Sequence, residues 1–82
     1  MKNNSAPAKT VDCRGLLCPE PVLRARQALA GLAPGSEVEI IATDPLAELD
    51  LQVYCQRSGH RFVGAQTRNG ETRVRIRVRP AP

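Results

Sequence analysis

The last part of the chain alternates aliphatic and basic residues, and this pattern limits the folds that the chain can adopt. An alternation with a period of two predicts a β-strand with one buried face and one face in water. The aliphatic positions are Val74, Ile76 and Val78, and the basic positions are Arg73, Arg75, Arg77 and Arg79. Because the arginine face must stay in water, helices must cover the other face, which predicts two layers.

A hairpin is predicted just before this strand. The Asn69-Gly70 pair suits a type I′ turn, in which both central residues have positive φ. The turn joins the arginine strand to a predicted strand over residues 60–68. Gly64 within that strand indicates a β-bulge or a close approach of another backbone.

Hydrophobic periodicity predicts four earlier elements. The predicted strands are residues 9–13 and 37–43, and the predicted helices are residues 19–32 and 46–58. In the first helix, Val22, Ala25 and Leu29 form the apolar face, and Gly31 helps to end it.

The second helix is predicted to begin with Asp44 as its N-cap and Pro45 at its first position. Two apolar stripes run along it, which predicts that the helix is covered on more than one side. One stripe is Ala47, Leu51, Tyr54 and Cys55, and the other is Leu46, Leu49 and Val53.

The order β-α-β-α-β-β predicts an α/β fold, namely a two-layer α/β sandwich with a mixed four-stranded sheet and two helices on one face. Right-handed crossovers between adjacent parallel strands place both helices on the same side. At 82 residues the chain is one domain. We expect residues 1–8 to be a disordered tail and residues 9–82 to be the folded domain.

The strongest functional signal is a cysteine between a turn and a predicted helix. If Cys18 caps this helix, its sulfur lies beside unpaired backbone N–H groups and the positive end of the helix dipole, which favours the thiolate. Pro19 suits the first helical position, and Pro21 is tolerated in the first turn. We therefore interpret Cys18 as a reactive nucleophile, with a small buried hydrophobic residue as the alternative.

Three neighbours are predicted to support this site. Arg14, four residues earlier, is placed to bring a positive charge to Cys18, and Gly15 supplies a turn position with positive φ. Glu20 suits the helix dipole, but its charge opposes a thiolate. The predicted environment of the sulfur is therefore moderately activating.

Three cysteines, an odd number, do not form a disulfide framework. Cys55 lies on an apolar helix face and is predicted to be structural. The pairs Cys13/Cys18 and Cys55/His60 raise the alternative of a zinc site, but their four intervening residues are wider than the spacing of common zinc motifs, so no metal is predicted. We interpret His60 as a residue at the start of a strand or a minor contributor near the site.

The first residues lack the apolar run of a signal peptide, and no segment is long and apolar enough to span a membrane. We therefore expect a cytoplasmic protein without a membrane partner. A reducing compartment is also where a free thiolate persists.

The net charge of +4 is unevenly distributed. Residues 10–56 hold seven acids and three arginines, whereas residues 57–82 hold seven arginines and one acid. The four arginines of the alternating strand are thus a candidate binding face for an acidic protein or a nucleic acid. Aromatic residues, on which bases stack, make up only 2% of the chain, which favours a solvated face balanced by Glu37 and Glu39 over direct nucleic-acid binding.

Several motifs resemble those of the TusA-like, or SirA-like, family of small sulfur-carrier proteins. They are residues 12–15, Cys18-Pro19-Glu20-Pro21, Thr43-Asp44-Pro45, Asp50 and residues 55–60. The Cys-Pro-x-Pro element is highly specific. The βαβαββ sandwich of this family agrees with the fold predicted above.

The resemblance implies that Cys18 accepts sulfane sulfur as a persulfide, without another cofactor, and passes it on as a sulfurtransferase. The implied donor is a protein such as a cysteine desulfurase or a rhodanese. The implied acceptor belongs to tRNA thiolation, molybdenum-cofactor synthesis or sulfur oxidation. We expect a monomer.

Two alternatives stay open at this point. Cys13 stands where many relatives carry another residue, and we interpret it either as a thiol that modulates the persulfide or as a half-buried strand residue. The alternative function for the whole chain is a non-catalytic RNA- or protein-binding module that uses the arginine strand.

Overall fold

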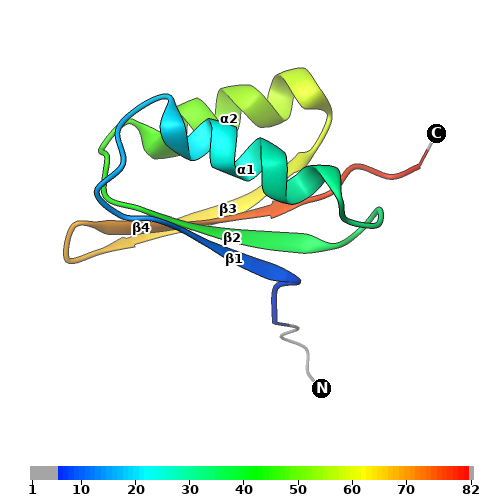
Figure 1. The fold of residues 1–82 in the computed structure, drawn as a ribbon, viewed down its shortest axis with the longest axis horizontal. Coiled ribbons are helices and arrows are strands. Elements are labelled where there is room, and N and C mark those ends of the chain that lie inside the picture. The colour runs from blue at the N-terminus through cyan, green and yellow to red at the C-terminus, as the bar shows by residue number, and fades with distance from the viewer. Residues whose placement is uncertain (1–5, 82) are drawn as a thin grey trace.

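The computed structural model describes residues 6–81 and shows the regular elements in the predicted order (Figure 1). They are β1 (Lys9–Cys13), α1 (Glu20–Ala30), β2 (Glu37–Ala42), α2 (Ala47–Ser58), β3 (Arg61–Arg68) and β4 (Glu71–Arg77). The order β-α-β-α-β-β is confirmed, and the boundaries lie close to those predicted from the sequence.

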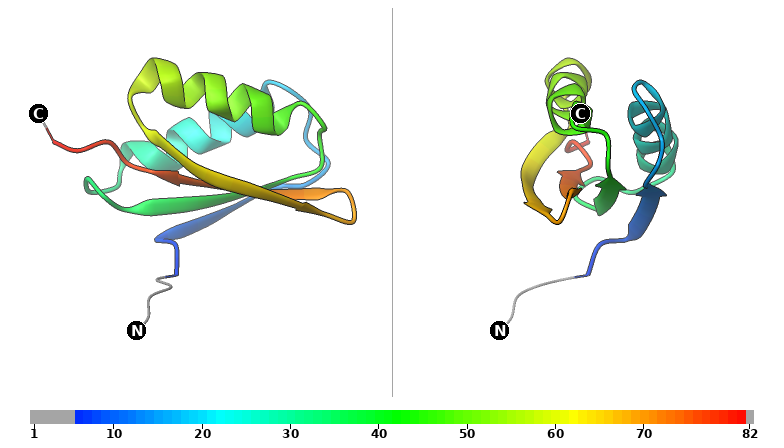
Figure 2. Two further views of the ribbon diagram at one scale, coloured as in Figure 1. Left: turned by 180° about the vertical axis from the view of Figure 1, so that it is seen from behind. Right: turned by 90° about the vertical axis from the view of Figure 1, so that its left-hand side faces the viewer.

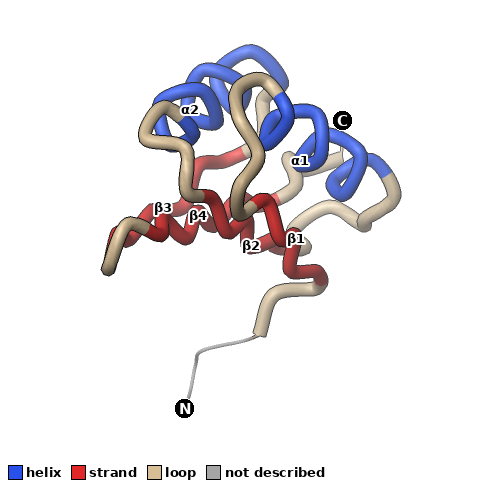
Figure 3. Tube along the Cα trace, turned by 60° about the vertical axis from the view of Figure 1, so that its left-hand side comes forward, coloured by secondary structure: helices blue, strands red, loops and turns tan. Residues whose placement is uncertain are grey.

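The strands form one mixed sheet in the order β1-β2-β4-β3. β1 and β2 are parallel, and β4 pairs antiparallel with both β2 and β3. Both helices cover the same face of the sheet, and the opposite face is open (Figures 2 and 3). The predicted two-layer α/β sandwich is therefore confirmed.

One part of the predicted topology is wrong. The second crossover, through α2, does not join adjacent strands, because β4 lies between β2 and β3. The inward side chains of β4, Val74 and Ile76, have no exposed surface. A central position buries them on both sides, which an edge position would not do.

The closing hairpin has the predicted geometry. Asn69 and Gly70 have φ values of 53° and 78°, as a type I′ turn requires. The pairing of β3 with β4 shifts register between Phe62 and Gly64, which confirms the irregularity predicted at Gly64.

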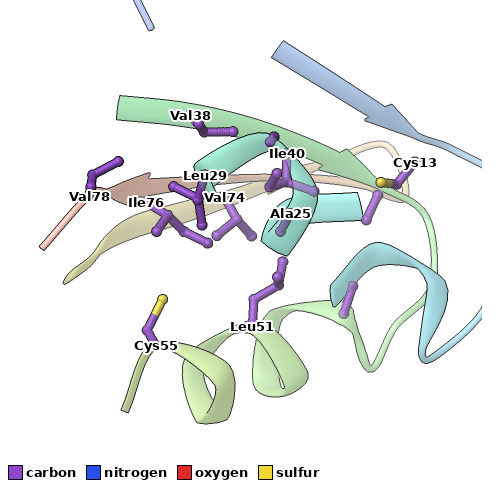
Figure 4. Close-up of a cluster of buried hydrophobic side chains, with 13 residues drawn as sticks. Cys13, Ala25, Leu29, Val38, Ile40, Leu51, Cys55, Val74, Ile76 and Val78 are labelled. Carbon is purple, nitrogen blue, oxygen red and sulfur yellow. The ribbon is translucent and has the colours of Figure 1, made fainter. Parts of the chain in front are cut away.

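The core lies between the helices and the covered face of the sheet (Figure 4). Leu29 of α1 and Leu51 of α2 share it with aliphatic side chains from the central strands. Those strand residues are Val38, Ile40, Val74 and Ile76. The core is almost wholly aliphatic, as the shortage of aromatic residues requires.

The second apolar stripe of α2 is not covered, contrary to prediction. The exposed fractions of Leu46, Leu49 and Val53 are 56%, 58% and 37%. A two-layer fold offers α2 only the sheet below it and α1 beside it. Its remaining face is therefore open to solvent.

The predicted tail of residues 1–8 lies mostly outside the described residues. Within the described part, the backbone N–H of Ala8 donates to the Glu37 carbonyl at 2.7 Å. No helix within residues 6–81 combines the length and the hydropathy needed to cross a membrane.

Candidate functional site

Cys18 lies in the loop that joins β1 to α1, and its side chain is exposed. Gly15 begins the turn with φ of 80°, which confirms the predicted positive value, and its N–H donates to Thr43 Oγ1 at 2.8 Å. The backbone N–H of Leu16 returns to the Cys13 carbonyl at 3.1 Å. These contacts turn the chain sharply at the end of β1 and project Cys18 outward.

One carboxylate connects this loop to the loop after β2. Asp44 accepts the backbone N–H of Cys18 on Oδ2 at 2.7 Å and the backbone N–H of Leu46 on Oδ1 at 3.0 Å. Asp44 is only 9% exposed. Charge-assisted hydrogen bonds of this kind fix the backbone at Cys18 relative to the start of α2.

The start of each helix differs from the prediction. Pro19, not Cys18, is the N-cap of α1, so Pro19 is outside the helix and Pro21 is at its second position. Leu46, not Asp44, is the N-cap of α2, because a turn over residues 45–46 precedes the helix. Asp44 still satisfies donors at this end of the helix, through its contact with Leu46.

The environment of the sulfur is also different from the one predicted. The pKa of Cys18 is raised, first by a hydrogen bond with the Asp50 side chain, then by desolvation and by the charges of Asp50 and Asp44. The resting group is therefore the thiol, whereas the helix dipole was expected to favour the thiolate.

The backbone explains why the helix does not stabilise a thiolate. Pro19 and Pro21 have no N–H to donate. The first remaining donor, Glu20 N–H, is already bonded to the Leu17 carbonyl at 2.8 Å, and the Val22 N–H is bonded to the Pro19 carbonyl at 3.1 Å. Neither of these N–H groups is therefore free to donate to the Cys18 sulfur and offset the effect of the nearby carboxylates on its pKa.

Arg14 does not bring a positive charge to Cys18. Its guanidinium donates to both carboxylate oxygens of Asp12, at 2.9 and 3.0 Å, and reaches Glu71 at 3.4 Å. The hydrogen bonds from Arg14 lower the pKa of Asp12 to about 2. Arg14 is thus part of the open sheet face and not of the cysteine site.

Glu20 also has a partner other than the sulfur. Its Oε1 atom lies 3.7 Å from Nε of Arg24, which is one turn further along α1. Asp44 and Asp50 are the acids that act on Cys18. From the sequence, Asp44 was expected as a helix cap, and Asp50 was named only among the residues of the family resemblance.

A topological signal points to Asp44 and Asp50. The parallel strands β1 and β2 are neighbours, so their carboxyl ends lie at the same edge of the sheet. The loops that follow them must therefore meet, and the first turns of α1 and α2 lie beside each other (Figure 1). Polar residues just after the second strand were thus candidates for contact with Cys18.

The other two cysteines are part of the core. Cys13 and Cys55 are 0% and 3% exposed, and they lie at opposite ends of the core (Figure 4). Burial raises the pKa of both thiols, that of Cys55 to about 11. This burial supports the structural interpretation of each residue, while a modulating role for Cys13 stays a prediction.

His60 lies beyond the carboxyl end of α2, whereas Asp44 and Asp50 lie at its start. A helix of this length spans about 18 Å. His60 is therefore remote from Cys18. Within the described part of the chain, no three His, Cys, Asp or Glu side chains are grouped so that they could hold a metal ion.

The arginines of β4 belong to a connected set of ion pairs on the open sheet face, which we call the charge ladder. Neighbouring members are 2.6 to 4.0 Å apart. In order of contact they are Asp12, Arg14, Glu71, Arg73, Glu39, Arg75, Glu37 and Arg77. The ladder contains as many acids as arginines, which supports the balanced, solvated interpretation of this face.

Arg79 does not share the open face with Arg73, Arg75 and Arg77. β4 ends at Arg77, and the Arg79 guanidinium donates to the Ser58 carbonyl at the end of α2, at 2.5 Å. The predicted four-arginine binding face is therefore divided between two sides of the molecule.

Comparisons with known proteins give several matches. The family model described as sulfurtransferase TusA matches residues 9–78. A candidate sulfur carrier protein of Archaeoglobus fulgidus is 49% identical over 55 residues, which cover 67% of this chain and 71% of that protein. One from Neisseria meningitidis serogroup A is 38% identical over 63 residues, which cover 77% of this chain and 85% of that protein.

A solved structure is also similar. The crystal structure of a SirA-like protein from Desulfitobacterium hafniense matches with a TM-score of 0.78 and 30% identity. The match covers 87% of this chain and 97% of that one.

Proposed function

This chain belongs to the TusA sulfurtransferase family, and from that premise we propose that it carries sulfane sulfur as a persulfide on Cys18. The observation that supports this assignment is the contrast among the thiols. Cys18 is exposed on a loop that Asp44 holds in place, whereas Cys13 and Cys55 are buried. A carrier needs one sulfur that two different partner proteins can reach in turn.

Transfer from a persulfide donor, such as a loaded cysteine desulfurase or rhodanese, needs no net oxidant. The Cys18 sulfur attacks the outer sulfur of the donor persulfide and forms a new S–S bond. The S–S bond of the donor breaks, and the donor cysteine leaves as a thiolate. Delivery to the acceptor repeats this exchange with the roles reversed.

Asp50 takes the proton in this proposal. Its carboxylate raises the pKa of the Cys18 thiol, so the resting carrier is protonated and a proton acceptor lies nearby. A protonated thiol is also less prone to oxidation than a thiolate.

The partners are proteins that approach the cysteine loop in the cytoplasm. Leu17 is 71% exposed beside Cys18, and Leu46 is 56% exposed beside Asp44. These leucines offer an apolar contact around the sulfur. We place the acceptor in tRNA thiolation, molybdenum-cofactor synthesis or sulfur oxidation, and the carrier acts as a monomer without a bound cofactor.

The test is the intact mass of the protein after incubation with a cysteine desulfurase and cysteine. Wild type should gain the mass of sulfur and lose it on reduction, and Cys18→Ser should gain none. Cys55→Ala is the matched control, because it removes a buried thiol and should leave uptake intact with a modest loss of stability. Sulfur uptake by folded Cys18→Ser would disprove the assignment.

A further inference from the structure

A groove runs along α1 toward the end of the molecule opposite the cysteine loop. It has a volume of about 700 Å³, within the range of ligand sites in proteins. Its walls are α1 from Val22 onward, the end of α2 and the C-terminal segment. That segment leaves the sheet at the end of the molecule where both helices end (Figures 1 and 2). Leu29 and Val78 belong to its apolar lining.

The charged residues of the groove are basic throughout residues 6–81. Arg26, Arg57 and Arg79 come from three different segments of the chain, and no described acid lines the groove. Within residues 6–81, none of these three guanidiniums is in an ion pair with a carboxylate. This contrasts with the charge ladder, where arginines and acids balance.

A histidine in the groove is held as a hydrogen-bond donor. His60 Nδ1 accepts the backbone N–H of Arg79 at 3.0 Å, so the proton of the neutral ring is on Nε2. Burial, and to a smaller extent the charge of Arg79, lowers the pKa of His60, which keeps the ring neutral. The His60 ring also contacts Tyr54, with ring centroids 6.0 Å apart.

Electrostatics at a helix terminus does not account for the whole cluster. Arg57 is in the last turn of α2, where a cation offsets the negative end of the helix dipole, and Arg79 caps the Ser58 carbonyl. Arg26 lies a full turn before the end of α1, and no described acid pairs with it.

We propose that this groove binds a small organic anion, with its oxyanion among the arginines and its apolar body on the aliphatic floor. Guanidinium groups bind carboxylate and phosphate oxygens through paired hydrogen bonds. Because no described carboxylate lines the groove, a bound anion would supply acceptor atoms for Arg26 and Arg57, while Arg79 already donates to the Ser58 carbonyl.

The groove reaches Val22 and Leu23 in the first turn of α1, but its arginine cluster lies further along. Arg26 is roughly 10 Å along the helix from Pro19, so the anion would bind apart from the sulfur.

The test uses phenyl phosphate as the probe and the backbone amide NMR spectrum of the full chain as the readout. Saturable shifts should concentrate at the groove, for example at Ser58, His60 and Arg79. The double variant Arg26→Gln/Arg57→Gln should weaken binding by about tenfold or more. Arg61→Gln/Arg68→Gln removes the same charge outside the groove and should bind as wild type does.

Three results would overturn the proposal. They are an absence of saturable shifts in wild type, equal weakening in both double variants, and equal affinity for benzyl alcohol, which has the ring but no anion. Sulfur uptake on Cys18, measured on the same samples, should be unchanged in both double variants. Failure of sulfur uptake in wild type would count against the proposed function and not against the groove.

Discussion

At Cys18, two carboxylates have different tasks. Asp44 accepts the backbone N–H at 2.7 Å and sets where the cysteine stands. Asp50 is the largest cause of the raised pKa of the thiol. Asp44 therefore fixes the position of Cys18 and also adds to that raised pKa through its charge.

Asp50→Asn should make Cys18 more reactive toward iodoacetamide. Removing the carboxylate removes the largest cause of the raised pKa, so the pKa falls and more thiolate is present at neutral pH. We expect alkylation to become severalfold faster near neutrality. The rate should be measured against pH by mass spectrometry.

Glu48→Gln is the matched control for this variant. It removes one negative charge from the same helix, and Glu48 is not among the groups that shift the pKa of Cys18. Because Cys13 and Cys55 are buried in the folded protein, the early alkylation signal comes from Cys18. An alkylation rate in Asp50→Asn equal to that of wild type, or slower, would contradict the role given to Asp50.

Among the elements, α2 shows best how the layers decide burial. Both of its apolar stripes have helical spacing, yet the sheet and α1 cover only one of them. Leu51 is fully buried, whereas Leu49 is 58% exposed two residues earlier. The exposed stripe begins at Leu46, next to the loop that carries Asp44.

Truncation of these two leucines should have unequal effects on stability. Leu51→Ala should lower the free energy of unfolding by roughly 2–5 kcal/mol, because it leaves a cavity in the core. Leu49→Ala should change it by about 0.5 kcal/mol or less. Urea unfolding followed by circular dichroism measures both, and a similar loss in the two variants would show that the exposed stripe is covered.

Across the whole molecule, charge is sorted by location. The charge ladder on the open sheet face is balanced, and acids such as Asp44 and Asp50 lie around Cys18. Arginines without an ion pair among residues 6–81 line the groove toward the other end. The net charge of +4 therefore does not represent the local charge at either end of the molecule. A partner that approaches the cysteine loop meets a different field from a ligand that approaches the groove.

The charge ladder should contribute stability that is lost in acid. Hydrogen bonds from Arg77 and then Arg75 hold the pKa of Glu37 below its ordinary value of 4.5. A pKa that is lower in the folded state gives stability that is present above the ordinary value and is lost as the pH falls through the folded-state value. Glu37→Gln should thus lower the free energy of unfolding by about 0.5–1 kcal/mol at neutral pH.

The pH dependence distinguishes this effect from a general one. The difference between wild type and Glu37→Gln should shrink as the pH falls below 4.5, because protonated Glu37 resembles glutamine. Urea unfolding over that pH range measures it, with Glu48→Gln as the control outside the ladder. A constant difference at all pH values would show that the ion pairs with Glu37 add nothing.

The sequence by itself determined the local structure. The Asn69-Gly70 turn, the alternation in β4, the two helices and the exposed turn at Cys18 each depend on residues that are close together in the chain. Dihedral preferences and hydrophobic periodicity act over this short range, so the elements and their order were predictable. The Cys-Pro-x-Pro element was the most specific of the motifs that indicated the family.

Only the tertiary structure decided the environment of the site. Contacts between residues 26 and 28 positions apart join the Cys18 loop to Asp44 and Thr43, and a contact across 57 positions draws Arg14 toward Glu71. These pairs depend on the strand order, in which β1 lies beside β2 and β4 enters between β2 and β3. Local sequence patterns do not predict that strand order. The raised pKa of Cys18 and the separation of Arg79 from the other arginines therefore follow from packing, because side chains distant in sequence meet only once the sheet has formed.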